Sequence, residues 1–162
     1  MRLFSSKFVL FIILASLFLT SCSKKDEKAI HKIHWDRDMC SLCKMVISQR
    51  KYAVQVINPK AHRSYMFDDI GCTVLWFKDE KIEWEKEAII YIADVNSGKF
   101  IDAKKAYYDI GLITPMDYGF SAYKDKNSVK FPKQIMNYEE VRLKILRGET
   151  MQNPLIKKGL SR

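Results

Sequence analysis

The chain has 162 residues, a formal net charge of +9 and 48% hydrophobic residues. This length restricts it to one domain, with enough apolar residues for a substantial core. The positive charge favours contact with anionic lipid headgroups or an acidic protein partner, or serves solubility alone. Nucleic acid is not an expected partner, because the N-terminus predicts export.

The first predicted element is a secretion signal over residues 1–21. Two basic residues precede an apolar run at 8–19, which is shorter than the roughly 20 residues of a membrane-spanning helix. The run ends in the letters LTSC at Cys22, which resemble the lipobox of bacterial lipoproteins. The resemblance implies that Cys22 is lipidated and becomes the mature N-terminus. We therefore expect an exported protein, lipid-anchored to a bacterial membrane and facing the periplasm or the cell exterior.

Export also restricts the cysteine chemistry. Removing residues 1–21 leaves a net charge of +7, and three cysteines follow Cys22. An odd number in an oxidising compartment argues against a framework of disulfides alone. Residues 22–33 are charged and lack an apolar period, so we expect a flexible membrane tether there. A domain at 34–150 and a basic C-terminal tail at 151–162 complete the predicted organisation.

Strand and helix patterns alternate along the predicted domain. The expected elements are strands at 52–58 and 63–67, a helix at 70–78, strands at 88–93 and 99–103, a short helix at 103–109, strands at 118–124 and 128–131, and a helix at 138–147. The order strand–strand–helix occurs at about 46–78 and again at about 118–147. This repetition predicts an α+β fold of two similar ββα lobes, with a metal site between or beside them.

The candidate metal ligands come from a sulfur-rich segment. Two cysteines and two methionines lie within residues 39–45, and Cys43 and Met45 are two positions apart. On a strand, such residues point to the same face. A thiolate beside a thioether is a soft donor pair suited to copper(I). Met116 holds the corresponding place before the first strand of the second lobe, so a site shared by Cys43, Met45 and Met116 is expected.

The other cysteines and histidines receive weaker assignments. Cys40 is either an auxiliary ligand or a redox partner of Cys43. His34, shortly before the cluster, is a further candidate ligand. Cys72 lies within the predicted helix among apolar residues and is expected to be a buried, inert thiol.

Several segments in this order are typical of a known family. They are CSLCKM at 40–45, MFDD at 66–69, IADVNSGKFIDA at 92–103, TPM at 114–116 and GFSAY at 119–123. Together they resemble NosL, the copper-binding lipoproteins of nitrous oxide reductase maturation, over about residues 38–147. The resemblance implies two related ββα lobes, and copper(I) delivery to nitrous oxide reductase rather than catalysis. The chain departs from the family at Lys44 and Asp117, where glycine is usual and permits tight backbone geometry.

Two other functions remain open at this point. A thioredoxin-like oxidoreductase would use Cys40 and Cys43, but such a pair should open a helix after a buried strand in a βαβ unit. A structural zinc-binding protein would need four nitrogen or sulfur ligands. Cys40, Cys43, Cys72 and a histidine could supply them.

Overall fold

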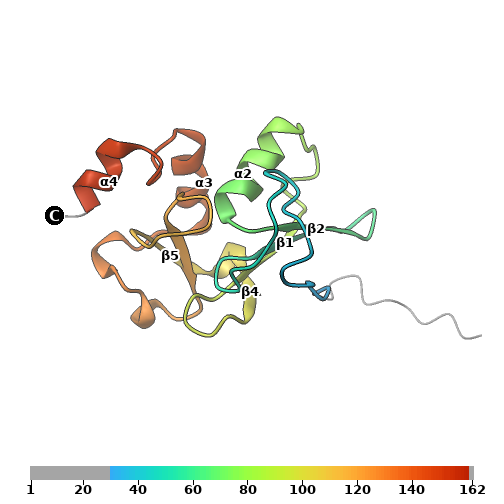
Figure 1. The fold of residues 1–162 in the computed structure, drawn as a ribbon, viewed down its shortest axis with the longest axis horizontal. Coiled ribbons are helices and arrows are strands. Elements are labelled where there is room, and N and C mark those ends of the chain that lie inside the picture. The colour runs from blue at the N-terminus through green and yellow to red at the C-terminus, as the bar shows by residue number, and fades with distance from the viewer. Residues whose placement is uncertain (1–29, 161–162) are drawn as a thin grey trace, which may run out of the picture.

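The structure, a computed structural model, describes residues 30–160 as an α+β domain with antiparallel sheets (Figure 1). The predicted signal at 1–21, Cys22 and residues 23–29 of the predicted tether lie outside the described residues. The elements are β1 (Val54–Asn58), β2 (Arg63–Phe67), α2 (Ile70–Asp79), β3 (Ile89–Ala93), β4 (Phe100–Asp102), η2 (Ala103–Lys105), β5 (Tyr107–Ile110), β6 (Phe120–Tyr123), η3 (Lys126–Ser128), η4 (Pro132–Gln134), α3 (Tyr138–Leu146) and α4 (Pro154–Leu160). Across 30–160, no helix combines the length and apolarity that crossing a bilayer requires.

The larger sheet has four antiparallel strands in the order β2-β1-β3-β4. All five residues of the inner strand β1 (VQVIN) are buried, including the polar Gln55 and Asn58. Its central residue Val56 pairs with Tyr65 of β2 and with Ile90 of β3. The strands predicted at 52–58, 63–67, 88–93 and 99–103 are confirmed, with ends that differ by at most two residues.

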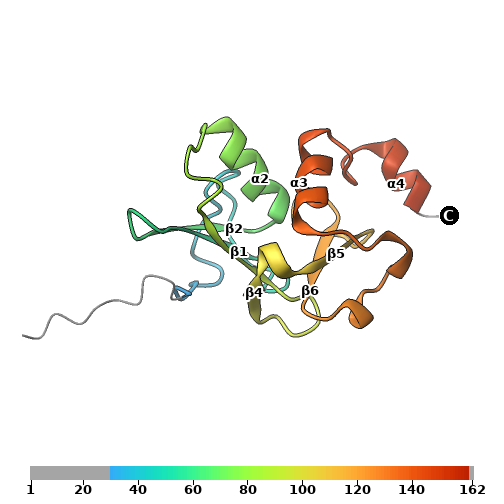
Figure 2. The same cartoon turned by 180° about the vertical axis from the view of Figure 1, so that it is seen from behind.

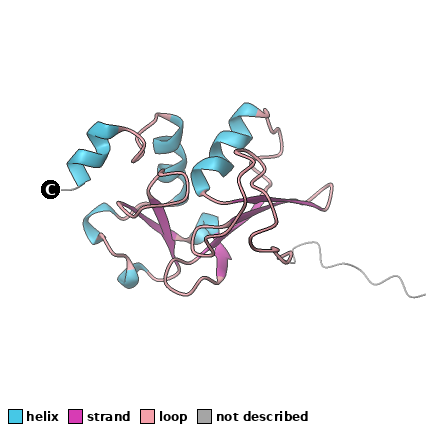
Figure 3. Cartoon of the chain, in the orientation of Figure 1, coloured by secondary structure: helices cyan, strands magenta, loops and turns pink. Residues whose placement is uncertain are grey.

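Helix α2 follows β2 directly and confirms the predicted helix at 70–78. Asp69 is its N-cap, in an extended conformation, and the side chain accepts a hydrogen bond from the Gly71 N–H at 3.1 Å. Farther along the helix, the Trp76 ring lies 4.6 Å from the ring of Tyr65 between centroids. Figure 3 shows α2, α3 and α4 on one side of the strands.

The second sheet corrects part of the predicted repeat. It contains only β5 and β6 among the described residues. Of the predicted helix at 103–109, residues 103–105 form the 3-10 helix η2, whereas 107–109 belong to strand β5. Residues 128–131 form no strand. The backbone of Met136 instead exchanges both hydrogen bonds with Tyr108 of β5, at 2.8 and 2.9 Å, and Pro132 lacks an N–H for a ladder. The predicted two ββα lobes are therefore not confirmed.

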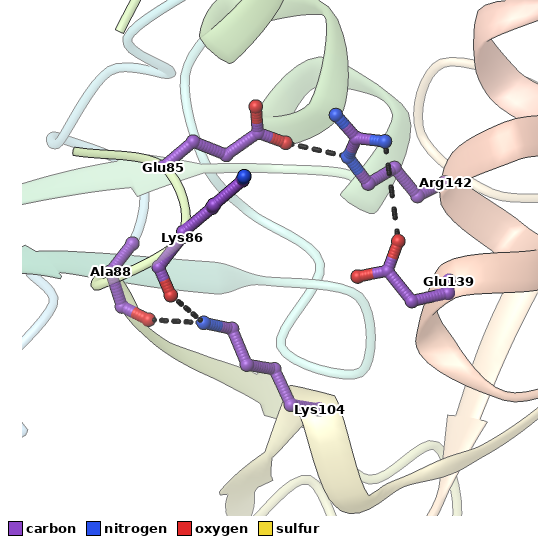
Figure 4. Close-up of polar contacts among 6 residues, drawn as sticks. All are labelled: Glu85, Lys86, Ala88, Lys104, Glu139 and Arg142. Atoms are coloured by element: carbon purple, nitrogen blue, oxygen red, sulfur yellow. Dashed lines mark hydrogen bonds and ion pairs between the residues drawn. The ribbon is translucent and has the colours of Figure 1, made fainter. Parts of the chain in front are cut away.

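Helix α3 closes the domain and confirms the predicted helix at 138–147. Asn137 and Glu140 form a reciprocal capping box at its start. The helix packs beside α2, and Arg142 donates from Nε to Glu85, in the connection after α2, at 2.6 Å (Figure 4). In the same view Lys104 donates to the carbonyls of Lys86 and Ala88.

Both ends of the described chain also contact the domain. Ile33 is buried, and the backbone of His31 both donates to and accepts from the Gln55 side chain. Near the other end Met151 is buried, and α4 occupies most of the predicted basic tail. The ordered domain thus includes residues on both sides of the expected 34–150 region.

Candidate metal centre

A short hairpin at residues 38–47 presents the first two cysteines. Met39 and Val46 form an antiparallel bridge, and the Cys40 N–H donates to the Met45 carbonyl at 2.8 Å. Cys43 lies in the turn of this hairpin, so the prediction that Cys43 and Met45 project from one strand is wrong. Because residues opposite each other in an antiparallel pair share a face, Cys40 and Met45 lie on one face, and Met39 and Val46 on the other.

The turn is tight because residue 44 adopts a left-handed conformation. Lys44 has φ of 61°, and its N–H donates to the Cys40 carbonyl at 3.1 Å. Glycine adopts this conformation at the least cost. Lys44 therefore adopts the backbone conformation that usually requires glycine. Its side-chain Nζ donates to the Ser41 carbonyl at 2.6 Å.

The hairpin folds against the junction between β2 and α2 and completes a cluster of four side chains. The Ser41 N–H donates to the Met66 carbonyl at 2.8 Å, which fixes the hairpin to β2. The sulfur atoms of Cys40, Cys43 and Cys72 and a carboxylate oxygen of Asp68 all lie within 4.8 Å of one another. The Cys43 thiol lies 3.5 and 3.7 Å from the two Asp68 oxygens. All three cysteines are free thiols, and only Cys43 is partly exposed.

Hydrogen bonds make the three thiols electrostatically unequal. A hydrogen bond from the Cys72 thiol lowers the pKa of Cys40 to about 6, against the opposing effect of burial. Backbone N–H groups of Asp68, Cys43 and Leu42 stabilise the Cys40 thiolate further. The same hydrogen bond, to Cys40, raises the pKa of Cys72 far above its ordinary range. Burial raises the pKa of Cys43 to about 11. Cys40 is therefore the thiol of the cluster that loses its proton most readily, whereas Cys43 and Cys72 would release protons only on binding a metal.

A second loop lies against the helix that carries Cys72. The Thr114 hydroxyl donates to Asp69 Oδ2 at 2.5 Å, and the Met116 N–H donates to the same oxygen at 3.3 Å. Asp117 has φ of 55°, again a left-handed conformation. This loop therefore attaches, through Asp69, directly beside the Asp68 of the cluster.

The C-terminal segment holds the second loop from its other side. The Gln152 side chain donates to the Met116 carbonyl at 2.8 Å, and Lys157 pairs with Asp117 at 2.7 Å. Met116 is half-buried and packs against the core. The residues after 150 are therefore part of the support of this loop.

The predicted ligands fall into separate groups. Cys40 and Cys43 are in the cluster. Met45 is 53% exposed on the hairpin, beside Cys40 on the same face. Met116 lies in the second loop, and its role stays a prediction, as does that of Met45. His34 is exposed and lies 3.5 Å from Asp38, outside the cluster.

Sequence reasoning missed Asp68 as a member of the cluster, and it placed Cys72 beside Cys40 and Cys43 only in the alternative zinc site. Cys72 is fully buried, as expected, but its sulfur faces other sulfurs rather than apolar groups alone. A usable signal was the closeness in sequence: Asp68 directly precedes the N-cap Asp69, and Cys72 lies in the first turn of the helix that follows. A carboxylate and a thiol this close in sequence would have suggested a polar site.

The chemistry of this donor set is that of a metal site. Thiolates bind copper(I) and zinc, and a carboxylate adds a harder donor that zinc accepts. The cysteine pair is in a hairpin turn, and every strand pairing within 30–160 is antiparallel. The described residues therefore lack the strand–helix setting of a thioredoxin-type pair.

Fold and site together define an antiparallel α+β domain with a thiol–carboxylate cluster that could hold a metal ion. Among solved structures, the chain is similar to the copper chaperone NosL from Shewanella denitrificans, with a TM-score of 0.53 and 15% identity. The match covers 70% of this chain and 95% of that chain, and shows a shared fold. That neighbour is a chaperone rather than an enzyme. No protein-family model and no curated protein sequence matches the chain.

Proposed function

We propose that this protein binds copper(I) as cargo and delivers it to an exported copper enzyme, with nitrous oxide reductase as the recipient. The observation that carries the proposal is the convergence of three thiol sulfurs within 4.8 Å of one another. Soft thiolates select copper(I). The similarity in fold to a copper chaperone supports the same function, and a delivery role requires no catalytic residue.

The proposal extends to where the protein works. A lipid on Cys22 would hold it at a bacterial membrane, facing the periplasm or the cell exterior, where copper enzymes receive their metal. The LTSC sequence at the end of the apolar run supports this location. A Cys22→Ala variant should leave the membrane fraction, and its retention there would contradict the lipid anchor.

The ligands divide by accessibility. Cys40 and Cys72 are fully buried, whereas Cys43 is partly exposed and Met45 is 53% exposed. An incoming ion therefore meets Met45 and Cys43 before the buried thiols. In this scheme Cys43 is the central ligand, because it belongs to the cluster and is also accessible from solvent. Met45 and Met116 are the thioether donors on either side.

The test is a competition titration with a copper(I) chelator, run anaerobically on reduced protein. Cys43→Ala should weaken binding at least a hundredfold, about 2.7 kcal/mol, because it removes the accessible anionic donor. Circular dichroism checks that each variant is folded. Tight binding by a folded Cys43→Ala variant would reject Cys43 as the central ligand, and tight binding by a folded Cys40→Ala/Cys43→Ala double variant would reject this site for copper. Cys72→Ala then shows whether the third thiol contributes.

Structural zinc is the second candidate, and Asp68 is the observation that favours it. A tetrahedral zinc site would use the carboxylate as its fourth ligand, whereas copper(I) is satisfied by two or three sulfurs. Asp68→Ala should leave copper(I) affinity within about threefold if copper is the cargo. A loss of at least about tenfold in zinc affinity, with unfolding of the unaltered protein by chelators, supports zinc instead.

A further inference from the structure

An apolar groove lies beside α4, near the C-terminal end of the described chain. It has a volume of about 450 Å³ and runs between α4 and residues 134–136. Its walls are largely aliphatic, with Ile135 and Met136 on one side and Ile156 and Leu160 on the other. Lys144 and Glu149 line it as well, but they pair with each other at 3.0 Å. The groove therefore offers hydrocarbon rather than free polar groups.

Both segments that border the groove are basic. Residues 126–133, which lead into the groove wall at 134–136, carry three exposed lysines, and the acid Asp125 precedes them. Helix α4 carries Lys157 and Lys158, both exposed, and no acid. Figures 1 and 2 show the two segments at the same end of the domain, opposite the turn between β1 and β2. Lys157 is partly neutralised by Asp117, so a clear excess of positive charge remains at this end.

Exposed apolar side chains accompany these lysines. Leu155, which borders the groove, is 80% exposed, more than any other large hydrophobic residue that the structure describes. On the other side Phe131 is 36% exposed, and Lys130 Nζ lies 5.6 Å from its ring centroid. Lysines beside protruding apolar side chains are typical of surfaces that meet the headgroup region of an anionic bilayer.

We propose that this end of the protein, formed by α4 and residues 124–136, binds the surface of an anionic phospholipid membrane. The lysines contact lipid phosphates, while Leu155 and the groove take up acyl-chain hydrocarbon. An acidic polypeptide is the competing occupant, and the experiments below distinguish the two. The inference uses none of the cluster residues, although α4 also supports the Met116 loop through the Lys157–Asp117 pair. With an anchor at Cys22, the contact would orient the domain relative to the membrane.

The test measures local deuterium uptake of the full-length protein in vesicles. Phosphatidylcholine vesicles are compared with vesicles that also contain phosphatidylglycerol. Anionic vesicles should slow uptake in 124–136 and 150–160 by about threefold or more, and leave the turn at 59–62 unchanged. High salt should remove the charge-dependent part of the protection. Equal uptake in both kinds of vesicle would overturn the proposal.

Paired variants separate the two components of binding. Leu155→Asp should abolish the protection, whereas Leu143→Asp, an exposed leucine of α3 outside the groove, should not. Lys133→Glu should weaken it, whereas the same change at exposed Lys51 should have no effect. If soluble polyglutamate protects both segments and anionic vesicles do not, the surface accepts acidic polypeptides and the membrane proposal is wrong. Protection that survives Leu155→Asp would also contradict it.

Discussion

The loops that precede β1 and β6 share a backbone conformation and differ in what holds them. Each contains a non-glycine residue in the left-handed region, Lys44 with φ of 61° and Asp117 with φ of 55°. The first loop is closed by its own backbone, through the hydrogen bond from Cys40 to Met45. The second also has backbone hydrogen bonds of its own, from Gly111 to Gly119 and from Asp117 to Thr114, but side chains from elsewhere, Asp69 and Gln152, hold it as well. The cysteine loop is thus a local structure, whereas the geometry of the Met116 loop depends on the rest of the domain.

The largest expected effect is a loss of fold stability when a substitution in α2 disrupts its contact with Tyr118, at the end of the second loop. A Cβ added to Gly71 would lie 2.1 Å from the Tyr118 ring. Gly71→Ala should therefore lower the free energy of unfolding by about 3 kcal/mol, since a buried ring and a helix backbone must move apart. Urea unfolding measures the loss. Gly159→Ala, which meets open space within α4, is the matched control and should cost nothing. Unchanged stability in Gly71→Ala would show that the ring is not tightly packed there.

The contribution of each loop to metal binding is tested by its methionine. Met45→Leu and Met116→Leu should each weaken copper(I) binding at least tenfold, about 1.4 kcal/mol, because each removes one thioether and keeps the volume. The measurement is the anaerobic chelator competition. Since both donors serve one ion, the double variant should be non-additive.

Met136→Leu is the control for these variants, because Met136 is buried beside β5 rather than in either loop. If Met116→Leu binds as tightly as the parent, the second loop supplies no ligand. The metal would then be held by the cysteine loop and α2 alone.

A smaller, pH-dependent effect is expected from Asp109 of β5. Burial raises the pKa of Asp109, although the Tyr123 hydroxyl and the Phe131 N–H donate to it at 2.8 and 3.1 Å. The stability that follows from a raised pKa is fully present below about pH 4 and is lost as pH rises through the folded-state value. Asp109→Asn remains neutral and should lose this dependence.

Urea unfolding between acidic and neutral pH measures the Asp109 effect. The difference between parent and variant should change by at most about 1.4 kcal/mol per pH unit. Asp125→Asn, an exposed acid after β6, is the control and should show no comparable change. A parent protein that becomes more stable than the variant as pH rises would contradict the prediction.

The smallest expected changes in stability come from substituting Lys44 and Asp117, the two residues with a left-handed backbone conformation. Lys44→Gly should stabilise the fold by about 0.5–1 kcal/mol, because glycine adopts a positive φ without a Cβ penalty. Asp117→Gly should be close to neutral, because it relieves the same strain but removes the partner of Lys157. Thermal unfolding of the two variants gives the comparison. Equal stabilisation by both would show that the Lys157 pair contributes nothing.

Local signals explain what could be predicted from the sequence. Asp69 before an apolar period predicted the start of α2, alternation with β-branched residues predicted β1, and β2 was predicted as the strand that returns from it. The prediction of a strand at 128–131 was wrong because Met136 pairs with β5 instead. That pairing depends on the tertiary structure and has no local sequence signal. Cys72 was predicted to be a buried, inert thiol. Cys40 and Cys43 reach it only because the hydrogen bond from Ser41 to Met66 holds their hairpin against β2. No local pattern encodes that contact.

The hydrogen bond from Thr114 to Asp69 has a consequence for the order of folding. These residues are 45 positions apart, whereas the four cluster residues all lie between 40 and 72. Contacts between distant segments pay a larger loop-closure entropy and form later than local ones. The thiol cluster can therefore form without the Met116 loop, because none of its four residues belongs to that loop. If a metal binds during folding, it would meet a site of sulfur and carboxylate before the second loop docks beside it.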